Sequence, residues 1–300
     1  MIATSPPRRC LLFVPGARPE RFDKALASGA DQVCIDLEDA VGGDDKVTAR
    51  EATLQFILAT QNKSAPSDQS AQSGPPPQLG LRINSISGLD HDTRALGLAD
   101  LQRIVETGAR PAFIMLPKIE DAEDVLRAEK ILAHTDIPVI AQLESPHAIF
   151  EARAIAGACK RVQALMFGGY DYAVAARVKP GERGWFWARA QLAAAAAEAE
   201  IGALDVPSLE LKNMDEVAAE TEQVIALGYT GKAAIHPSQV ATIQNIFLPT
   251  ADEHQRALRV LAAVASATSA AIQVDGKLVD RPIELAAQRV VELARLGLRG

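Results

Sequence analysis

Polar side chains follow most of the short apolar runs of this 300-residue chain, close to the point where each run ends. If such runs form parallel strands, their carboxyl ends meet at one rim, and in a barrel that rim carries the chemistry. Loops in general are polar too, but they rarely place a charge beside so many strand ends. We therefore expect an active site that includes Asp36, Glu38, Asp39, Arg82, Glu144 and Asp171.

Two carboxylates on neighbouring runs, Glu144 and Asp171, could share a divalent cation. Mg²⁺ prefers oxygen ligands in octahedral geometry and typically takes one or two carboxylates, which leaves other positions to water and substrate. The pair Gly168-Gly169 favours this interpretation, because residues without a side chain let a ligand approach the backbone. The alternative is that Glu144 caps a helix beginning at Pro146 and that Asp171 caps a helix beyond Tyr172.

Arg82 has two interpretations. Its planar guanidinium could hold a substrate carboxylate through two hydrogen bonds, which lysine does less well. The alternative is an ion pair with Asp36 or Glu38. Because Asp36 lies deepest in its apolar run, we expect it to orient its neighbours rather than to bind a metal.

Basic residues also follow the first apolar run. Arg18 and Lys24 lie on the loop and helix after it, where backbone N–H groups at a helix start would suit phosphates. The alternative is a solvated surface. For Lys46 and Arg50, which lie one turn apart on a later helix, a solvated surface is the interpretation that we favour.

Short apolar, β-branched runs alternate with longer helical patterns along the chain. Several runs are apolar throughout, as strands covered on both faces should be. Eight such units in about 240 residues predict an α/β fold, a closed (β/α)8 TIM barrel, with a doubly wound open sheet as the alternative. The predicted strands are Cys10–Val14, Gln32–Leu37, Gly80–Ile83, Ala112–Leu116, Pro138–Leu143, Ala164–Phe167, Ala203–Val206 and Ala233–Ile235. The predicted helices are Pro19–Ala27, Asp44–Ala59, His91–Glu106, Ala122–His134, Pro146–Ala156, Trp185–Ile201 and Met214–Leu227.

Two segments fall outside this alternation. Residues 61–79 are polar, rich in Pro, Ser and Gln and without periodicity, which predicts a flexible surface loop within a catalytic barrel domain over 1–248. Residues 249–300 are surplus to a barrel. They predict a helix over 251–269, a hairpin with Asp275-Gly276 at its turn and a helix over 282–296. We expect this C-terminal helix–hairpin–helix extension to serve as a lid and an oligomer contact.

The composition excludes several classes of protein. A hydrophobic content of 48% supports a sizeable core, and a net charge of −7 argues against a nucleic-acid binder, which would carry a basic stripe. No apolar stretch reaches the roughly 18 residues of a membrane span. The stretch after Arg8 and Arg9 stops at Pro15, too early for a secretion signal. Three widely spaced cysteines predict reduced thiols, so we expect a cytoplasmic protein.

A set of ordered motifs runs from Arg9 to about Ala287. The motifs are RCLLFVPGARPERFDKALASGADQVCIDLEDAVGGDDKVTAR, LRINS, IMLPKIE, QLESPHAI, LMFGGYDYA, KAAIHPSQV and KLVDRPI. Together they resemble the citrate lyase β-subunit-like family, within the HpcH/HpaI aldolase superfamily that also holds malyl-CoA and citramalyl-CoA lyases. An ordered set is far more specific than any single motif.

The resemblance implies a (β/α)8 barrel that breaks or forms a C–C bond between an acyl thioester and a 2-oxo acid. It implies Mg²⁺, with Mn²⁺ as an alternative ion, held by Glu144 and Asp171. Arg82 would then bind the oxo-acid part of the substrate, and the acidic motif Asp36–Asp39 would support the metal and its waters.

The resemblance also implies a carrier site and an assembly. Coenzyme A would be held by the first loop and helix, which suggests Phe13, Arg18 and Lys24. Members of the family are commonly trimers or hexamers in which the C-terminal segment closes over a neighbour's site. Asp280 in KLVDRP matches an acid that serves as proton donor or acceptor in some lyases of the group.

The activity implied is Mg²⁺-dependent cleavage of a β-hydroxy acyl-CoA thioester, such as malyl-CoA or citramalyl-CoA, into a 2-oxo acid and acetyl-CoA. One alternative is a citrate lyase β subunit that acts on a citryl group attached to an acyl carrier protein. Another is a non-catalytic homologue that only binds acyl-CoA. The chain departs from the usual family pattern at Ser145-Pro146-His147 and at Tyr172, next to the implied metal ligands, which leaves the acyl group open.

Overall fold

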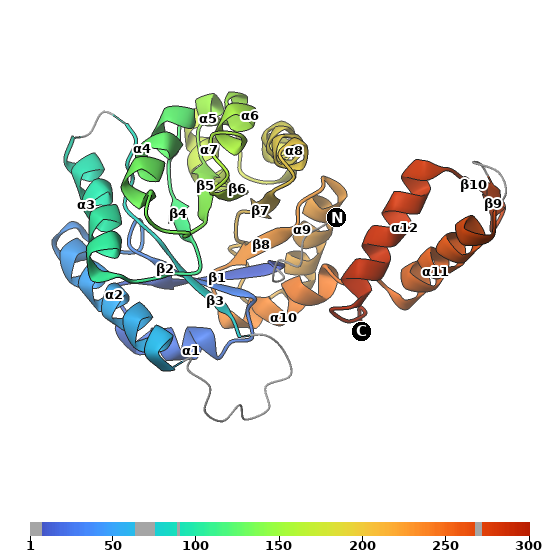
Figure 1. Ribbon diagram of the computed structural model, residues 1–300, viewed down its shortest axis with the longest axis horizontal. Coiled ribbons are helices and arrows are strands. Elements are labelled where there is room, and N and C mark those ends of the chain that lie inside the picture. Colours follow the sequence, from blue (N-terminus) through green and yellow to red (C-terminus); the bar gives the residue numbers. More distant parts are fainter. Residues whose placement is uncertain (1–7, 64–75, 89–90, 268–271) are drawn as a thin grey trace.

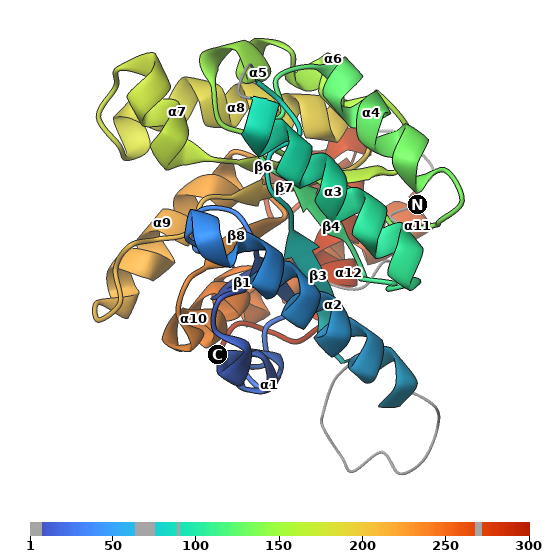
Figure 2. The same ribbon diagram turned by 90° about the vertical axis from the view of Figure 1, so that its left-hand side faces the viewer.

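The computed structural model describes residues 8–63, 76–88, 91–267 and 272–300. Eight parallel strands close into a barrel in sequence order, and helices surround it (Figures 1 and 2). The barrel closes where the first strand pairs with the eighth, which confirms the predicted (β/α)8 fold and excludes the open sheet. The strands are β1 (Cys10–Pro15), β2 (Gln32–Asp36), β3 (Gln78–Arg82), β4 (Ile114–Leu116), β5 (Val139–Leu143), β6 (Val162–Phe167), β7 (Gly202–Asp205) and β8 (Gly231–Ala234).

Helical segments connect the strands, and most lie where the sequence predicts them. The predicted helix over Pro146–Ala156 is two short helices, because the backbone at Glu151 leaves the helical region (φ −86°, ψ 1°). Helix α10 was not predicted, and α7 was considered only as the helix that Asp171 would cap. The segments are η1 (Pro19–Arg21), α1 (Phe22–Leu26), η2 (Gly43–Asp45), α2 (Lys46–Lys63), α3 (His91–Thr107), α4 (Ala122–Leu132), α5 (Pro146–Phe150), α6 (Ala152–Ala156), α7 (Gly169–Ala176), α8 (Glu182–Glu198), α9 (Met214–Ala226) and α10 (Pro237–Ile246).

The predicted loop over 61–79 is wrong at both ends. Helix α2 continues through Lys63, and strand β3 begins at Gln78. Residues 64–75, the middle of that prediction, lie outside the described residues. Within the part of the chain that is described, no helix is long and apolar enough to cross a membrane.

Inward-pointing apolar side chains fill the barrel. They form one cluster of Leu11, Cys34, Phe113, Met115, Ile140, Ala164, Met166, Leu204 and Ala233. Alternating side chains of the strands point outward into the larger core beneath the helices. Gly80 makes room inside the barrel, because a Cβ atom there would lie 2.6 Å from the ring of Phe113. The packed interior leaves the carboxyl ends of the strands as the place for a site.

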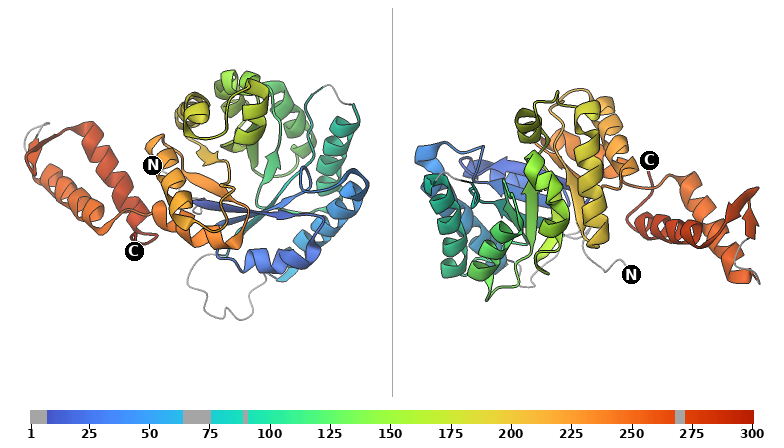
Figure 3. Two further views of the ribbon diagram at one scale, coloured as in Figure 1. Left: turned by 180° about the vertical axis from the view of Figure 1, so that it is seen from behind. Right: turned by 90° about the horizontal axis from the view of Figure 1, so that it is seen from above.

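The C-terminal residues form the predicted helix–hairpin–helix, which we call the arm (residues 251–294). It consists of α11 (Ala251–Ser266), the antiparallel strands β9 (Ile272–Val274) and β10 (Lys277–Val279), and α12 (Arg281–Ala294). Its turn residues, Asp275 and Gly276, both have positive φ. The two helices lie side by side and stand away from the barrel, beyond α9 and α10 (Figures 1 and 3).

A buried ionic network ties β7 and β8 to helix α8. Asp205 accepts two hydrogen bonds from Arg189, at 2.9 and 3.0 Å, and a third from Lys232 Nζ at 2.7 Å. The side chains of Asp205 and Lys232 are both 0% exposed, so each charge depends on its partners. Lys232 Nζ also donates to the carbonyl of Val206, at 2.8 Å.

Asp205→Ala should lower the free energy of unfolding by about 3–5 kcal/mol, because two buried cations, Arg189 and Lys232, lose their shared carboxylate partner. Urea denaturation followed by circular dichroism measures this loss, with the exposed Asp215→Ala on α9 as the control. A loss below about 1 kcal/mol would mean that the network adds no more than a surface ion pair does.

Candidate active site

A cavity of about 290 Å³ opens at the carboxyl ends of the strands. Its polar wall comes from β2, β3, β5 and the segment after β6. The wall consists of Asp36, Asp39, Arg82, Gln142, Gly168 and Asp171. The structure thus brings together at one rim the acids and the arginine that the sequence singles out.

Arg82 is engaged by the acidic residues that follow β2. The register pairs Asp36 with Arg82 on adjacent strands, and Asp36 accepts from Nε at 2.7 Å and from Nη2 at 2.6 Å. Arg82 Nη1 also lies 3.2 Å from Glu38 Oε2, and its guanidinium lies over the ring of Phe13, 5.1 Å from the centroid. The ion pair considered as the alternative is therefore present. The edge of the guanidinium that could bind a substrate carboxylate through two hydrogen bonds already binds Asp36. Contact between Arg82 and a substrate stays a prediction.

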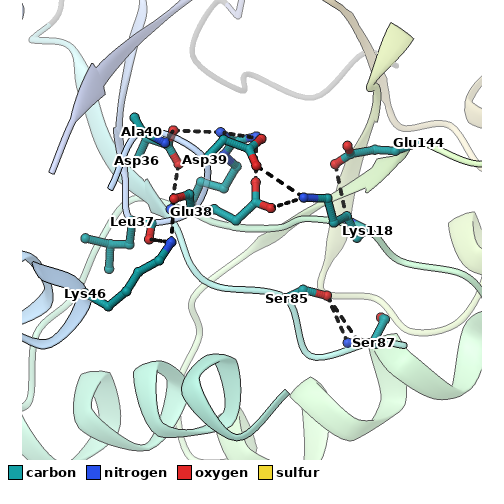
Figure 4. Close-up of polar contacts among 11 residues, drawn as sticks. Asp36, Leu37, Glu38, Asp39, Ala40, Lys46, Ser85, Ser87, Lys118 and Glu144 are labelled. Carbon is teal, nitrogen blue, oxygen red and sulfur yellow. Dashed lines mark hydrogen bonds and ion pairs between the residues drawn. The ribbon is translucent and has the colours of Figure 1, made fainter. Parts of the chain in front are cut away.

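Lys118 joins the acidic motif to Glu144 (Figure 4). Its backbone has a positive φ of 54°, and its N–H donates to Glu144 Oε1 at 3.3 Å. Its ammonium contacts Glu38 and lies 3.2 Å from Asp39 Oδ1. Lys118 is thus a part of this site, although the sequence interpretation assigned no role to it. The signal for it was its place two residues after an apolar run.

Two other basic residues were interpreted as solvated charges, and that interpretation is wrong. Lys46 Nζ donates to the backbone carbonyls of Leu37 and Glu38, at 2.9 and 2.5 Å, and so fixes the backbone of the acidic motif Asp36–Asp39. Arg50 is buried and lies 3.2 Å from Asp100 Oδ1. Helical spacing placed both residues on one face, but only the packing of α2 on the barrel decided that this face is covered.

Glu38 carries a perturbed carboxyl group. Burial raises its pKa to about 7, although Arg82 and Lys118 oppose the shift. A glutamate in the unfolded chain titrates near pH 4.3. Between about pH 4.3 and 7 the folded protein therefore binds more protons at Glu38 than the unfolded chain does. Stability contributed by Glu38 should therefore fall as the pH rises through that window.

Glu38→Gln removes this titration. Between about pH 5 and pH 8, the unfolding free energy of the native protein should fall more steeply than that of the variant, because only the native protein must ionise a buried carboxyl. Urea denaturation at several pH values gives both slopes. Parallel slopes would show that Glu38 titrates as it does in the unfolded chain.

Glu144 and Asp171 are direct neighbours, and Asp171 lines the cavity. Glu144 is buried, whereas Asp171 is exposed in the first turn of α7. Burial and the neighbouring carboxylate of Asp171 raise the pKa of Glu144 well above its usual range. The capping alternative is wrong for both residues. Ser145 caps α5 by accepting from the N–H of Ala148, and Asp171 makes no cap hydrogen bond at the start of α7.

The residues present fit a divalent cation. Two buried oxygens, Glu144 Oε2 and Gln142 Oε1, have no hydrogen-bond partner. A Cβ atom on Gly168 would lie 2.3 Å from Glu144 Cγ, so glycine leaves the space that Glu144 needs. No group of three or more His, Cys, Asp or Glu side chains is arranged for a metal among the described residues. Two carboxylates suffice for Mg²⁺, which usually keeps several waters.

The residues predicted to bind coenzyme A, and Asp280, are spread over the molecule. Phe13 lines the cavity beneath Arg82. Arg18 precedes η1 and Lys24 lies on α1, both exposed and outside the described lining of the cavity. Asp280 caps α12 on the arm, accepting from the N–H of Ile283 at 3.4 Å, and is exposed. The structure does not bring Asp280 to the cavity of its own chain.

The sequence signature of the HpcH/HpaI aldolase/citrate lyase family matches residues 9–237. Citrate lyase subunit beta of Haemophilus influenzae is 28% identical over 97% of this chain and 98% of its own length. The L-malyl-CoA/beta-methylmalyl-CoA lyase of Cereibacter sphaeroides is 31% identical over 91% of this chain and 90% of its own. Among solved structures, CitE of Mycobacterium tuberculosis in complex with magnesium, acetoacetate and coenzyme A superposes with a TM-score of 0.76, at 28% identity, over 98% of this chain and 100% of that one.

Proposed function

The chain belongs to the HpcH/HpaI aldolase/citrate lyase family, and from this premise we propose that it is a Mg²⁺-dependent carbon–carbon lyase. Its substrate is a β-hydroxy acyl thioester, such as malyl-CoA or citramalyl-CoA, and its products are a 2-oxo acid and an acetyl thioester. The observation that carries the proposal is the buried carboxylate of Glu144, which has one unpartnered oxygen and lies against Asp171 and Gly168 of the cavity lining. The lyase names of relatives similar over nearly the whole chain support it.

Glu144 and Asp171 hold the metal, and Gln142 offers a further oxygen. Bound Mg²⁺ would supply Lewis-acid chemistry, lowering the pKa of the substrate hydroxyl and stabilising the charge of the carbonyl that forms. The N–H of Lys118 orients Glu144 through Oε1 and leaves Oε2 free for the ion. The protein thus supplies a preformed site that costs little rearrangement when it is loaded.

Arg82 faces the charge that develops on the oxo-acid part. Its guanidinium is fixed by Asp36 and by Phe13, so its position does not depend on the substrate. Fixed positive charge aimed at a developing negative charge stabilises a transition state without reorganisation. Asp36, Glu38 and Asp39 keep Arg82 and Lys118 in place.

A proton must also move. As the bond between the carbinol carbon and the thioester CH₂ breaks, the hydroxyl gives its proton to a carboxylate base and becomes the carbonyl of the 2-oxo acid, and the electron pair of the broken bond passes to the thioester as an enolate. The enolate carbon then takes up a proton to give the acetyl thioester. We assign both the uptake of the hydroxyl proton and its return to the enolate carbon to Asp280 of a neighbouring copy, because Asp280 caps α12 and the arm stands away from its own barrel (Figure 3).

This assignment makes residues 249–300 a lid and an oligomer contact on the barrel domain 1–248. The assembly is a homotrimer or hexamer. Coenzyme A lies along β1 and α1, against Phe13, Arg18 and Lys24, so the thioester enters the cavity from the side of β1.

Asp280→Asn should lower kcat about 10²–10⁴-fold, because asparagine cannot transfer the proton. Asparagine still caps a helix well, so the oligomer should form, and Asp252→Asn on α11 is the matched control. Mixing Asp280→Asn with Glu144→Gln subunits should restore activity, since some mixed sites hold both intact residues. Normal turnover by Asp280→Asn would leave Asp280 as a helix cap alone.

The function is tested by incubating the protein and Mg²⁺ with malyl-, citramalyl- and citryl-CoA and measuring the 2-oxo acids released. Cleavage that requires Mg²⁺ supports the proposal, and no release from any of the three refutes it. The similarity to citrate lyase subunit beta favours one alternative, a citryl group on an acyl carrier protein. The same assay with carrier-protein thioesters tests that alternative.

A further inference from the structure

A second cavity, of about 210 Å³, lies between α8 and α9, two of the helices that cover the barrel (Figure 1). We call it the outer cavity. It shares no lining residue with the active-site cavity, and two rings separate them. Tyr170, which lines the first cavity, meets Trp185, which lines the second, edge to face with centroids 5.3 Å apart. The polar side chains of the outer cavity are Glu182, Trp185 and Arg189 of α8 and Glu216, Glu220 and Gln223 of α9.

Arg189 forms the inner end of the outer cavity. The residue is 3% exposed, and its guanidinium is held by Asp205, which accepts from Nε and Nη2, and by the ring of Trp185, whose centroid is 4.7 Å away. No hydrogen bond engages Nη1 among the described residues, and this atom keeps some exposure, so it opens into the cavity that Arg189 lines. A fixed guanidinium N–H without an acceptor suits a carboxylate.

Carboxylates surround the opening of the outer cavity. Glu182 begins α8 and Glu216 lies in the first turn of α9, and both are exposed. Neither has an ion pair among the described residues. Glu220 lies deeper, with a side chain that is 34% exposed and an Oε2 atom 3.5 Å from the buried Nζ of Lys232. Glu182 and Glu216 therefore remain available to an ammonium group.

A ligand with a single charge does not suit both ends of this cavity. An amine or a metal ion at the glutamates would leave Nη1 of Arg189 unpartnered. Deeper in the cavity it would meet two buried cations, Arg189 and Lys232. A simple carboxylate would reach Arg189 only past Glu182 and Glu216, which repel it. A molecule that carries both charges satisfies both ends.

We propose that the outer cavity binds a small amino acid as its zwitterion. The carboxylate accepts from Arg189 Nη1, and the ammonium group lies at Glu182 and Glu216. The cavity is smaller than the pockets that take drug-sized ligands, which restricts it to a compact molecule. The site is additional to the proposed lyase reaction, and its test needs no turnover.

The chain contains a reporter for this site. Trp185 and Trp187 are its two tryptophans, and Trp187 is 45% exposed, so Trp187→Phe should fold and leave Trp185 as the one indole. In this full-length variant, glycine, β-alanine and 4-aminobutyrate are titrated while the fluorescence of Trp185 is followed. At least one should give a saturable change at millimolar concentration or below. Acetate and methylammonium, which carry one charge each, should bind about tenfold more weakly or less. No saturable change with any amino acid, or equal binding of either single-charge ion, would overturn the inference.

Two exposed glutamates test the ammonium end. In the Trp187→Phe background, Glu182→Gln with Glu216→Gln should weaken the amino acid about fivefold or more, because two surface attractions are lost. The matched control is Glu198→Gln with Asp215→Asn, which removes one exposed charge from each of the same helices outside the described lining. The control should bind as the parent does. Equal affinity in the Glu182/Glu216 variant would overturn the inference.

Discussion

Glu144→Gln is expected to abolish Mg²⁺-dependent cleavage, with a loss of about 10³-fold or more in kcat/KM. The substitution keeps the size of the side chain and the hydrogen bond from the N–H of Lys118, but it removes one of the two carboxylates proposed to hold the ion. Asp171→Asn should have a similar effect for the same reason. Steady-state release of the 2-oxo acid measures both.

The same variant separates metal binding from folding. Without the ion, Glu144→Gln should unfold at the same temperature as the native protein or a higher one, because a buried carboxyl beside Asp171 is replaced by a neutral amide. Saturating Mg²⁺ should raise the melting temperature of the native protein, since a ligand that binds only the folded state stabilises it. That rise should vanish in the variant. The exposed Glu123→Gln on α4 is the control and should keep it.

Unchanged turnover in Glu144→Gln would rule out its role as a ligand. A variant that loses activity yet keeps the full Mg²⁺-induced rise in melting temperature would place the ion elsewhere. Either result would return Glu144 to a structural role in the loop after β5.

Arg82→Met should cost about 3–5 kcal/mol of stability and most of the activity. The side chains of Arg82 and Asp36 are 9% and 5% exposed, so the variant leaves a buried carboxylate without its cationic partner and with only the hydrogen bonds from the N–H groups of Glu38 and Ala40. Chemical denaturation measures the first effect and thioester cleavage the second. Arg103→Met, which removes an arginine paired with Glu51 and Glu106 on the outside of the barrel, should change stability little.

A second substitution separates the two effects. Adding Asp36→Asn to Arg82→Met removes the buried negative charge that has lost its cationic partner, and it should recover more than half of the lost stability. Activity should stay low, because the positive charge facing the oxo-acid part is still missing. If the double variant regained both, Arg82 would matter only as the partner of Asp36.

The sequence alone predicted a covered parallel sheet and the place of the site, while the pairing of β1 with β8 decided between a closed barrel and an open sheet. Eight apolar runs separated by helical patterns favour a covered parallel sheet, and parallel strands gather their carboxyl ends at one rim. That is why Asp36, Arg82, Glu144 and Asp171 could be assigned to one rim of the barrel from their positions along the chain. These are local features of each run, so no knowledge of distant contacts was needed.

The tertiary structure decided which of these charged groups contact one another. Strand register places Asp36 opposite Arg82 and commits the guanidinium to it. Lys118 reaches Glu38 and Glu144 only through a backbone with positive φ. The direction of the arm, which stands away from its own barrel (Figure 1) and whose helix α12 is capped by Asp280, is likewise a property of packing. Each depends on residues far apart in sequence, and spacing along the chain carries no information about such contacts until the barrel closes.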